Sequence, residues 1–274
     1  MNNQIIIQLE NVTKKFKKTT ILENITLQIH QGQSIALVGH NGVGKSTLLR
    51  IIAKLTAINS GKITYNKPLL FHYVPEQFPR NNLTVREYLD LFCRIDNHDK
   101  EVRQARIEAF LADFFMSHMA ETPLNYLSKG SLQKVGVIQA LLTTPDVLLL
   151  DEPLSGQDTK SQRVFIQKIK DLLANGMTII MSCHEPYLMN EISDTIVEIN
   201  DRQLQVTQHQ KQEIKQEFIL TFTDEKGDLE LPNLNVPMDK EEHHIKLYVE
   251  IDHTDEIIQL MMQHGWSLRG MHHE

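Results

Sequence analysis

A short glycine-rich stretch constrains this chain more than any other feature. Residues 39–47 read Gly-His-Asn-Gly-Val-Gly-Lys-Ser-Thr, which fits the pattern of a glycine, four further residues and Gly-Lys-Ser/Thr. The apolar run from Ile35 to Val38 predicts a buried strand before it, and helical spacing of apolar residues follows from Ser46 to Leu55. The glycines therefore form a turn in which backbone N–H groups and a helix N-terminus converge on one anion.

A turn of this kind binds phosphate groups, so we expect it to hold the phosphates of a nucleotide together with Mg²⁺. Lys45 would reach the β- and γ-phosphates, and the Ser46 hydroxyl would ligate Mg²⁺. His40 occupies a variable position and is expected to be a bystander. A chance match is disfavoured because the strand and the helix stand where the motif requires them. The remaining predicted nucleotide-binding residues of this loop are Gly39, Asn41, Gly42, Gly44 and Thr47.

A second apolar strand ends in two carboxylates. Val147 to Leu150 predicts a buried strand, and Asp151 and Glu152 follow directly. Ligands of open α/β sheets bind at the carboxyl ends of the strands, so Asp151 is expected to hold Mg²⁺ and Glu152 to polarise the attacking water as general base. A solvated acidic turn is the alternative, and the upstream phosphate loop disfavours it.

Three further positions have both a functional and a structural interpretation. Phe16 lies in a lysine-rich turn and is suited equally to stacking on adenine and to packing on its own β layer. Ser128 and Gly130 open a predicted helix, where they either face an anion or form an ordinary helix cap. His184 follows the strand Met177 to Met181 and either contacts the γ-phosphate or is structural.

Composition excludes several classes of protein. The 274 residues carry a formal charge of −7, which argues against a broad nucleic-acid-binding face. We find neither an apolar stretch of about 18 to 20 residues, which a membrane span needs, nor a signal peptide, so we expect a cytosolic chain. The two cysteines lack metal-ligand spacing and are expected to be reduced and buried. The histidine pairs are expected on the surface.

The order of predicted elements indicates two domains. Strands at Ile5 to Val12 and Ile25 to Ile29 predict an antiparallel β layer that leads into the α/β core, and a helical insertion is predicted from Val85 to Phe115. Polar residues 208–218 predict a linker or a short surface helix, and residues 224–228 a turn. A strand at 218–223, alternation over 245–251, a helix from Thr254 and a last strand near Trp266 predict a small α+β unit without a ligand motif.

Together these motifs resemble the nucleotide-binding subunit of an ATP-binding cassette (ABC) transporter over about the first three quarters of the chain. The resemblance implies a phosphate-loop NTPase with a RecA-like α/β core and an antiparallel β layer in residues 1–207, a helical subdomain at about 82–142 and an accessory α+β domain at 208–274. It implies that Phe16 stacks on adenine, that Gln77 senses the nucleotide and contacts Mg²⁺ and the membrane partner, and that His184 is a switch residue. Residues 127–131 resemble the signature loop, which binds ATP held by the opposite subunit, and residues 155–158, with Asp158, the loop that crosses the dimer interface.

The resemblance also implies an ATPase that dimerises on ATP and drives a separate integral membrane subunit at the cytoplasmic face of the cell membrane. The signature reads Leu-Ser-Lys-Gly-Ser instead of Leu-Ser-Gly-Gly-Gln, and Gln157 stands where leucine is typical. The lysine variant is similar to ABC-2 exporters, so we expect export. An ABC importer is the first alternative. A ribosome-binding cassette protein would carry two phosphate loops, and a DNA-repair ATPase would carry a long heptad insertion, and this chain has neither.

Overall fold

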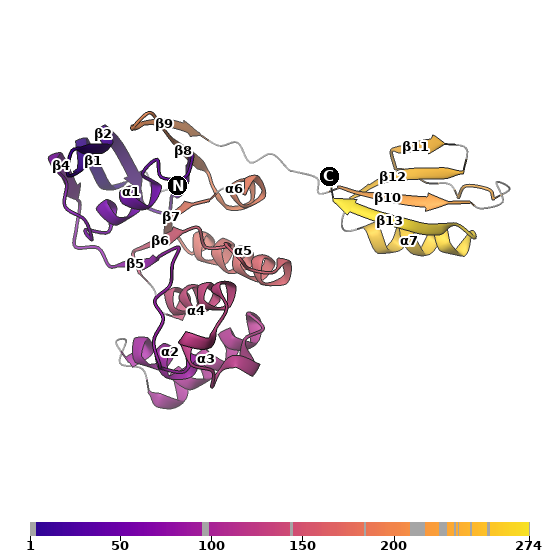
Figure 1. Cartoon of the computed structure of the whole chain (residues 1–274), viewed down its shortest axis with the longest axis horizontal. Coiled ribbons are helices and arrows are strands. Elements are labelled where there is room, and N and C mark those ends of the chain that lie inside the picture. The colour runs from indigo at the N-terminus through magenta and orange to yellow at the C-terminus, as the bar shows by residue number, and fades with distance from the viewer. Residues whose placement is uncertain are drawn as a thin grey trace. The chain divides into compact units, whose positions relative to one another are not determined.

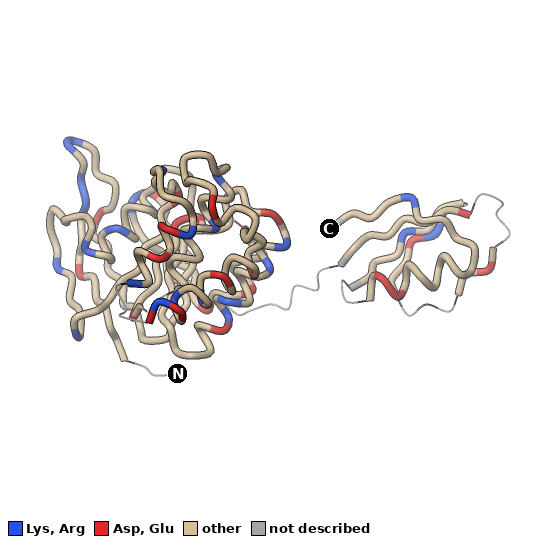
Figure 2. The backbone as a smooth tube through the Cα atoms, turned by 90° about the horizontal axis from the view of Figure 1, so that it is seen from below, with Lys and Arg blue, Asp and Glu red and all other residues tan. Residues whose placement is uncertain are grey.

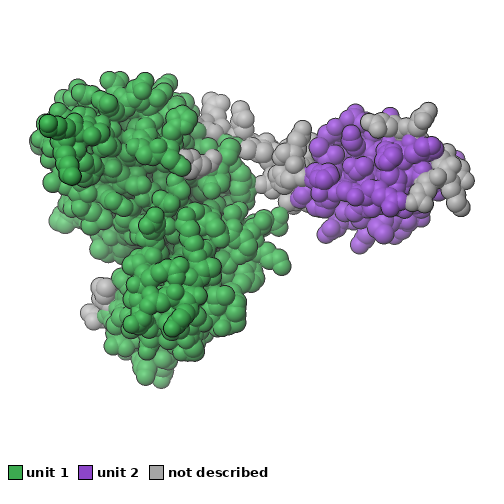
Figure 3. Space-filling view, viewed as in Figure 1, with its two compact units in different colours: residues 1–211 green, residues 212–274 purple. Residues whose placement is uncertain are grey.

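The computed structural model describes residues 4–94, 99–142, 145–183, 185–208, 217–224, 229–232, 234, 236–241, 243–250 and 253–273. The chain divides into two compact units, residues 1–211 and 212–274, coloured separately in Figure 3. The expected domain boundary at 207/208 lies four residues before this division. Figure 2 shows Lys, Arg, Asp and Glu interspersed along the backbone of each unit. Within the described residues, no helix is both long and apolar enough to cross a membrane.

The first unit contains a three-stranded antiparallel layer of order β2-β1-β4 (Figure 1). Its strands are β1 (Ile5–Phe16), β2 (Thr19–His30) and β4 (Ser60–Tyr65). The first two strands are longer than the sequence predicted, because they meet in a tight hairpin in which Phe16 pairs with Thr19 and Lys17 adopts a φ of 54°. Phe16 therefore lies at the end of a strand and not in a turn.

A six-stranded sheet of order β5-β6-β7-β3-β8-β9 forms the α/β core, in which only β9 is antiparallel. Its strands are β3 (Ser34–Val38), β5 (Phe71–Val74), β6 (Val147–Asp151), β7 (Thr178–Ser182), β8 (Thr195–Asn200) and β9 (Gln203–Gln208). Successive residues of β6 join different cores: Leu149 packs with helix α1 (Lys45–Ile52), whereas Leu148 packs with helix α5 (Thr159–Ala174). Coverage of both faces explains why the strand sequence is continuously apolar.

A helical subdomain follows β5. It contains α2 (Val85–Cys93), α3 (Lys100–Asp113), the short 3-10 turns η2 (Ser117–Met119) and η3 (Leu124–Tyr126), and α4 (Lys129–Leu142). A capping box between Thr84 and Glu87 begins α2. Leu89, Leu111 and Ile138 are fully buried where the helices meet. The helix α6 (Pro186–Ile192) follows β7. The α/β core, the antiparallel β layer and the helical subdomain predicted from the sequence are all present.

The second unit is a four-stranded antiparallel sheet of order β11-β12-β10-β13 with one helix packed on it. The elements are β10 (Glu217–Thr223), β11 (Met238–Glu241), β12 (His244–Glu250), α7 (Thr254–Gln263) and β13 (Ser267–His273). Met261 and Trp266 join Leu220, Phe222 and Leu247 in its core. The sequence did not predict β11, and most of the predicted linker at 208–218 and of the turn at 224–228 lies outside the described residues.

Candidate nucleotide-binding and catalytic site

The glycine-rich loop runs from the end of β3 to the start of α1, as the sequence predicted. Gly39 has a φ of 139°, and a Cβ there would lie 2.6 Å from the carbonyl oxygen of Ile199. Gly44 caps the helix with a φ of 119°. Both conformations disfavour any side chain, so these glycines are required by the backbone path. Lys45 is 5% exposed, and its Nζ donates to the carbonyl oxygens of Gly39 at 2.8 Å and His40 at 3.3 Å.

This loop forms one side of an open cavity of about 390 Å³. The cavity gathers residues that are far apart in the sequence: Phe16 and Ile21 from the β1–β2 hairpin, Glu76 after β5 and Glu152 after β6. Phe16 is half-exposed, and Lys14 Nζ lies 4.5 Å from its ring centroid. Its place on the cavity wall favours the stacking interpretation over simple packing. The other lining residues are Asn41, Gly42, Gly44, Lys45, Ser46 and Thr47.

Asp151 is the centre of a cluster of hydroxyl donors beneath the loop. Its side chain is nearly inaccessible, with the residue 2% exposed. Oδ1 accepts hydrogen bonds from Ser46 Oγ at 3.0 Å and Ser182 Oγ at 2.7 Å, and Oδ2 accepts one from the Tyr73 hydroxyl at 2.9 Å. Mg²⁺ prefers oxygen ligands of this kind, so the Ser46 hydroxyl and the Asp151 carboxylate fit the ion.

Tyr73 is a site residue that sequence reasoning missed. Burial, reinforced by the neighbouring Asp151 carboxylate, raises the pKa of Tyr73 to about 12. Tyr73 therefore remains a hydrogen-bond donor to Asp151 at neutral pH, and Arg50 Nε donates to its hydroxyl at 3.3 Å. Tyr73 lies near the end of β5, which β6 and β7 separate from the strand that precedes the glycine-rich loop.

Glu152 directs its side chain into the cavity after a sharp backbone turn. Its φ is 49°, and its N–H donates to Ser182 Oγ at 3.0 Å and to the Ser182 carbonyl oxygen at 3.1 Å. Ser182 thus contacts both carboxylate residues, because β7 is the neighbour of β6. A non-glycine residue in the left-handed region is uncommon and often occurs at functional positions. The geometry is compatible with the predicted role of Glu152 as general base.

The signature loop and the interface loop touch within the same chain. A Cβ added to Gly130 would lie 2.0 Å from the carbonyl oxygen of Gly156, so only glycine permits this approach. Ser128 caps α4 by accepting a hydrogen bond from the backbone N–H of Ser131 at 3.1 Å. Ser128 therefore has the structural role that the sequence left open, and its predicted contact with a nucleotide stays a prediction.

Asp158 is the N-cap of α5. It accepts from Ser161 N at 3.0 Å, and Lys134 Nζ lies 2.7 Å from its Oδ2. The hydrogen bond from Lys134, followed by that from Ser161, holds the pKa of Asp158 well below its usual range. In this chain the side chain is engaged in capping and in an ion pair, and its predicted nucleotide contact likewise stays a prediction.

Gln157 replaces the typical leucine of the interface loop and is buried. Its Nε2 donates to the carbonyl oxygen of Pro153 at 2.7 Å, which closes the loop that begins at Glu152. Its Oε1 accepts no hydrogen bond from the described residues. The Gln157 amide therefore links residues 153 and 157 by a hydrogen bond that a leucine side chain could not form.

Of the predicted residues that the structure describes, several do not line this cavity: Gly39, Gln77, Ser128, Gly130, Asp151 and Asp158. Gln77 is exposed and is not among the residues that line it, whereas the preceding Glu76 is. The predicted metal contact of Gln77 stays a prediction, and Glu76 is a second cavity residue that sequence reasoning missed. His184 lies outside the described residues, so its predicted switch role stays a prediction.

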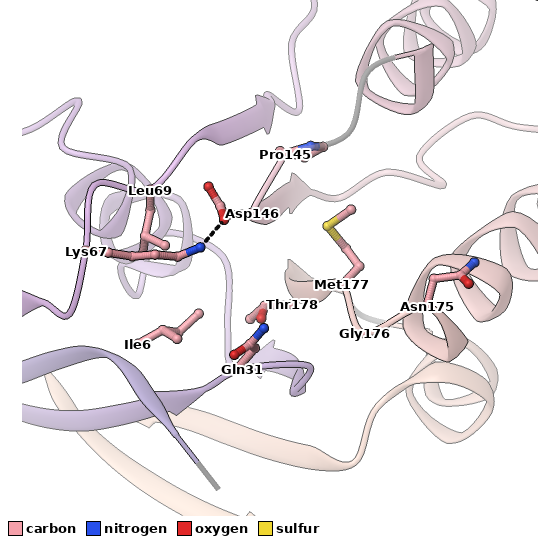
Figure 4. A pocket seen from close by; sticks show the side chains of 10 residues that line it. All are labelled: Ile6, Gln31, Lys67, Leu69, Pro145, Asp146, Asn175, Gly176, Met177 and Thr178. Atoms are coloured by element: carbon pink, nitrogen blue, oxygen red, sulfur yellow. Dashed lines mark hydrogen bonds and ion pairs between the residues drawn. The ribbon is translucent and has the colours of Figure 1, made fainter. Parts of the chain in front are cut away.

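Another cavity, of about 170 Å³, includes residues at the amino-terminal ends of β6 and β7 (Figure 4). An ion pair of 2.8 Å between Lys67 and Asp146 forms part of its wall. Its lining contains neither the glycine-rich loop nor a residue of the Asp151 cluster, so we do not assign it to nucleotide binding. The lining residues are Ile6, Gln31, Lys67, Leu69, Pro145, Asp146, Asn175, Gly176, Met177 and Thr178.

Comparisons with known proteins agree with this geometry. Residues 22–155 match the family model described as ABC transporter. The zinc import ATP-binding protein ZnuC of Haemophilus influenzae is 32% identical over 203 residues, which cover 73% of each chain. The Nod factor export ATP-binding protein I of Cupriavidus pinatubonensis is 31% identical over 194 residues, covering 65% of this chain and 58% of that protein.

The fold is also that of a solved cassette. The dimeric post-hydrolysis state of the ATP-binding cassette MJ0796, bound to ADP and Pi, superposes with a TM-score of 0.68 at 24% identity, covering 74% of this chain and 98% of that one. At this identity the likeness supports the fold alone. The sequence relatives and the family model show the family: the chain belongs to the ATP-binding subunits of ABC transporters and is an ATPase.

Proposed function

We propose that this chain hydrolyses Mg²⁺–ATP in the cavity between the phosphate loop and Glu152. The observation that carries the proposal is the convergence of Lys45, Ser46 and Glu152 on one cavity, with Asp151 bonded to Ser46 beneath it. Lys45 and the backbone N–H groups of the loop neutralise the phosphates, and Phe16 supplies a ring for the base. Ser46 and Asp151 would hold Mg²⁺, which neutralises charge that develops on the phosphate oxygens. Glu152 accepts the proton of the attacking water.

The hydrolysis is proposed to drive a separate integral membrane subunit at the cytoplasmic face of the membrane. Support comes from the family, whose members dimerise and act with membrane subunits, and from the signature and interface loops that lie together on this chain. Closure of two cassettes on ATP would couple nucleotide binding to the conformation of the attached subunit. The co-purification experiment described below would also show whether the second cassette is a copy of this chain or a different protein.

The direction of transport has two candidates with separate support. The lysine-containing signature at Leu127 to Ser131 favours export, which was our expectation from the sequence. The comparisons leave that expectation unconfirmed, because several of the relatives are zinc import proteins, among them those of Haemophilus influenzae and Photobacterium profundum. Import is therefore proposed as the competing direction, and the Nod factor export relative is the matching observation for export.

The test is co-purification of a trapped complex. A tagged Glu152→Gln chain is expressed in its native cell, Mg²⁺–ATP is added, and the membranes are solubilised in detergent. We expect a polytopic membrane protein to remain bound, and the Lys45→Ala chain, which should not bind ATP well, to retain less of it. An accompanying extracytoplasmic solute-binding protein would identify an importer. Recovery of ribosomes without a membrane protein would contradict the transport proposal.

A further inference from the structure

Lys129, one of the two residues at which the signature loop departs from Leu-Ser-Gly-Gly-Gln, lies at the junction of three segments that the proposed mechanism uses. Its Nζ is 3.1 Å from Ser155 Oγ in the interface loop and 3.6 Å from Glu76 Oε1. Glu76 in turn lines the nucleotide cavity. One ammonium group therefore connects the signature loop, the interface loop and the cavity wall.

The backbone beneath Lys129 is held in place. The next residue, Gly130, packs so closely on the backbone of Gly156 that an added Cβ would lie 2.0 Å from the Gly156 carbonyl oxygen. A relative displacement of the signature and interface loops would break this contact. The side chains above it have more freedom, because those of Lys129 and Glu76 are 57% and 40% exposed. Ion pairs between exposed side chains are weak, so this pair can be exchanged for a stronger partner.

The charge of Glu76 has a direct consequence for nucleotide binding. Glu76, Glu152 and Lys45 all line the same cavity. A triphosphate without its metal is repelled by such carboxylates, whereas a bound Mg²⁺ attracts them. The Lys129 ammonium offsets the charge of Glu76 as long as the two side chains remain paired.

We infer that the Glu76–Lys129 pair sets how strongly nucleotide binding depends on Mg²⁺. Lys129 is a positioning residue: its ammonium group pairs with the Glu76 carboxylate and so reduces the repulsion of a metal-free triphosphate, and a nucleotide-bound Mg²⁺ would compete with Lys129 for that carboxylate. Once unpaired from Glu76, Lys129 retains Ser155 as its partner in the interface loop. The inference rests on the proposed function, because it takes the cavity to be the nucleotide site.

The experiment compares the affinity of the purified chain for a fluorescent ATP analogue in excess EDTA and in excess Mg²⁺. In Lys129→Ala, Glu76 loses its cation, so binding in EDTA should weaken about threefold to tenfold while binding in Mg²⁺ changes less than about twofold. Lys129→Arg should restore the wild-type ratio of the two affinities. Glu76→Gln should tighten binding in EDTA, and adding Lys129→Ala to it should have little further effect.

Lys67→Ala is the matched control, because Lys67 forms an ion pair with Asp146 away from the nucleotide cavity. It should leave both affinities unchanged, and a thermal unfolding curve for each variant checks that the fold is intact. Equal weakening in EDTA and Mg²⁺, or the same loss with and without Glu76, would overturn the inference and make Lys129 a simple phosphate contact or a structural residue. Failure of the wild-type chain to bind the analogue would instead overturn the proposed nucleotide site.

Discussion

Ser46 Oγ donates a hydrogen bond of 3.0 Å to Asp151 Oδ1, so two predicted Mg²⁺ ligands 105 residues apart in sequence are already in contact. The contact arises because the phosphate loop follows β3 and Asp151 ends β6, with only β7 between them. Ser182 and Tyr73 hold the same carboxylate from two other strand ends. Three hydroxyl groups thus hold the carboxylate of the predicted Mg²⁺ site in one orientation.

The first prediction concerns this contact. Ser46→Ala removes one oxygen ligand but leaves Asp151 bonded to Ser182 and Tyr73, so the fold should persist while the Mg²⁺ concentration for half-maximal ATPase activity rises about tenfold or more. A magnesium titration of phosphate release measures the change. Ser34→Ala is the control, because Ser34 has a buried hydroxyl at the start of β3 without a partner among the described residues. An unchanged titration in Ser46→Ala would remove Ser46 from the metal site.

Glu152→Gln tests the general base. The amide keeps the size of the side chain but cannot accept the proton, so kcat should fall about 10²- to 10⁴-fold while ATP binding is retained. Phosphate release and equilibrium binding of ATP are measured on the same preparation. Glu101→Gln, on an exposed position of α3, should retain full activity. Near-normal hydrolysis by the Glu152 variant would exclude it as the base.

Gly130→Ala tests the contact between the signature and interface loops. The new Cβ would lie 2.0 Å from the carbonyl oxygen of Gly156, so the two loops must separate. We expect a loss of about 1–3 kcal/mol in unfolding free energy and a fall in ATPase activity. Denaturant unfolding and phosphate release test both effects. Gly176→Ala is the comparison variant for the effect of backbone strain without a steric clash, because Gly176 has a φ of 82° and nothing lies within 4 Å of the added Cβ.

Asp158→Asn separates capping from charge pairing. Asparagine still caps α5, but the ion pair with Lys134 is lost, so the free energy of unfolding at pH 7 should fall by about 1 kcal/mol. The pKa of Asp158 is lowered in the folded state, so its stabilisation is present above the unfolded-state value of about 3.9 and declines as pH falls below it. Denaturant unfolding at several pH values should show the variant and the wild type converging below about pH 4. A constant difference down to pH 3 would contradict this account.

Local patterns were sufficient for much of the fold. The continuous apolar runs of β3, β6 and β7 and the glycine-rich turn are short-range signals, because burial on both faces and the need for positive φ act on neighbouring residues. The hairpin of β1 and β2 extended beyond its predicted bounds because cross-strand pairing tolerates the polar residues of its exposed half. β11 was missed because its four residues carry no alternation of their own.

The sequence by itself determined the phosphate loop, the acidic end of β6 and the cassette family, since each is encoded by residue types at fixed spacing. Only the tertiary structure decided which side chains share the cavity. Tyr73 and Glu76 lie at the end of β5 and just after it, whereas Lys129 begins α4, and their contacts depend on strand order and on the approach of Gly130 to Gly156. Such contacts join residues without any regular separation in sequence, so the choice of Glu76 over Gln77 as a wall of the cavity required the folded chain.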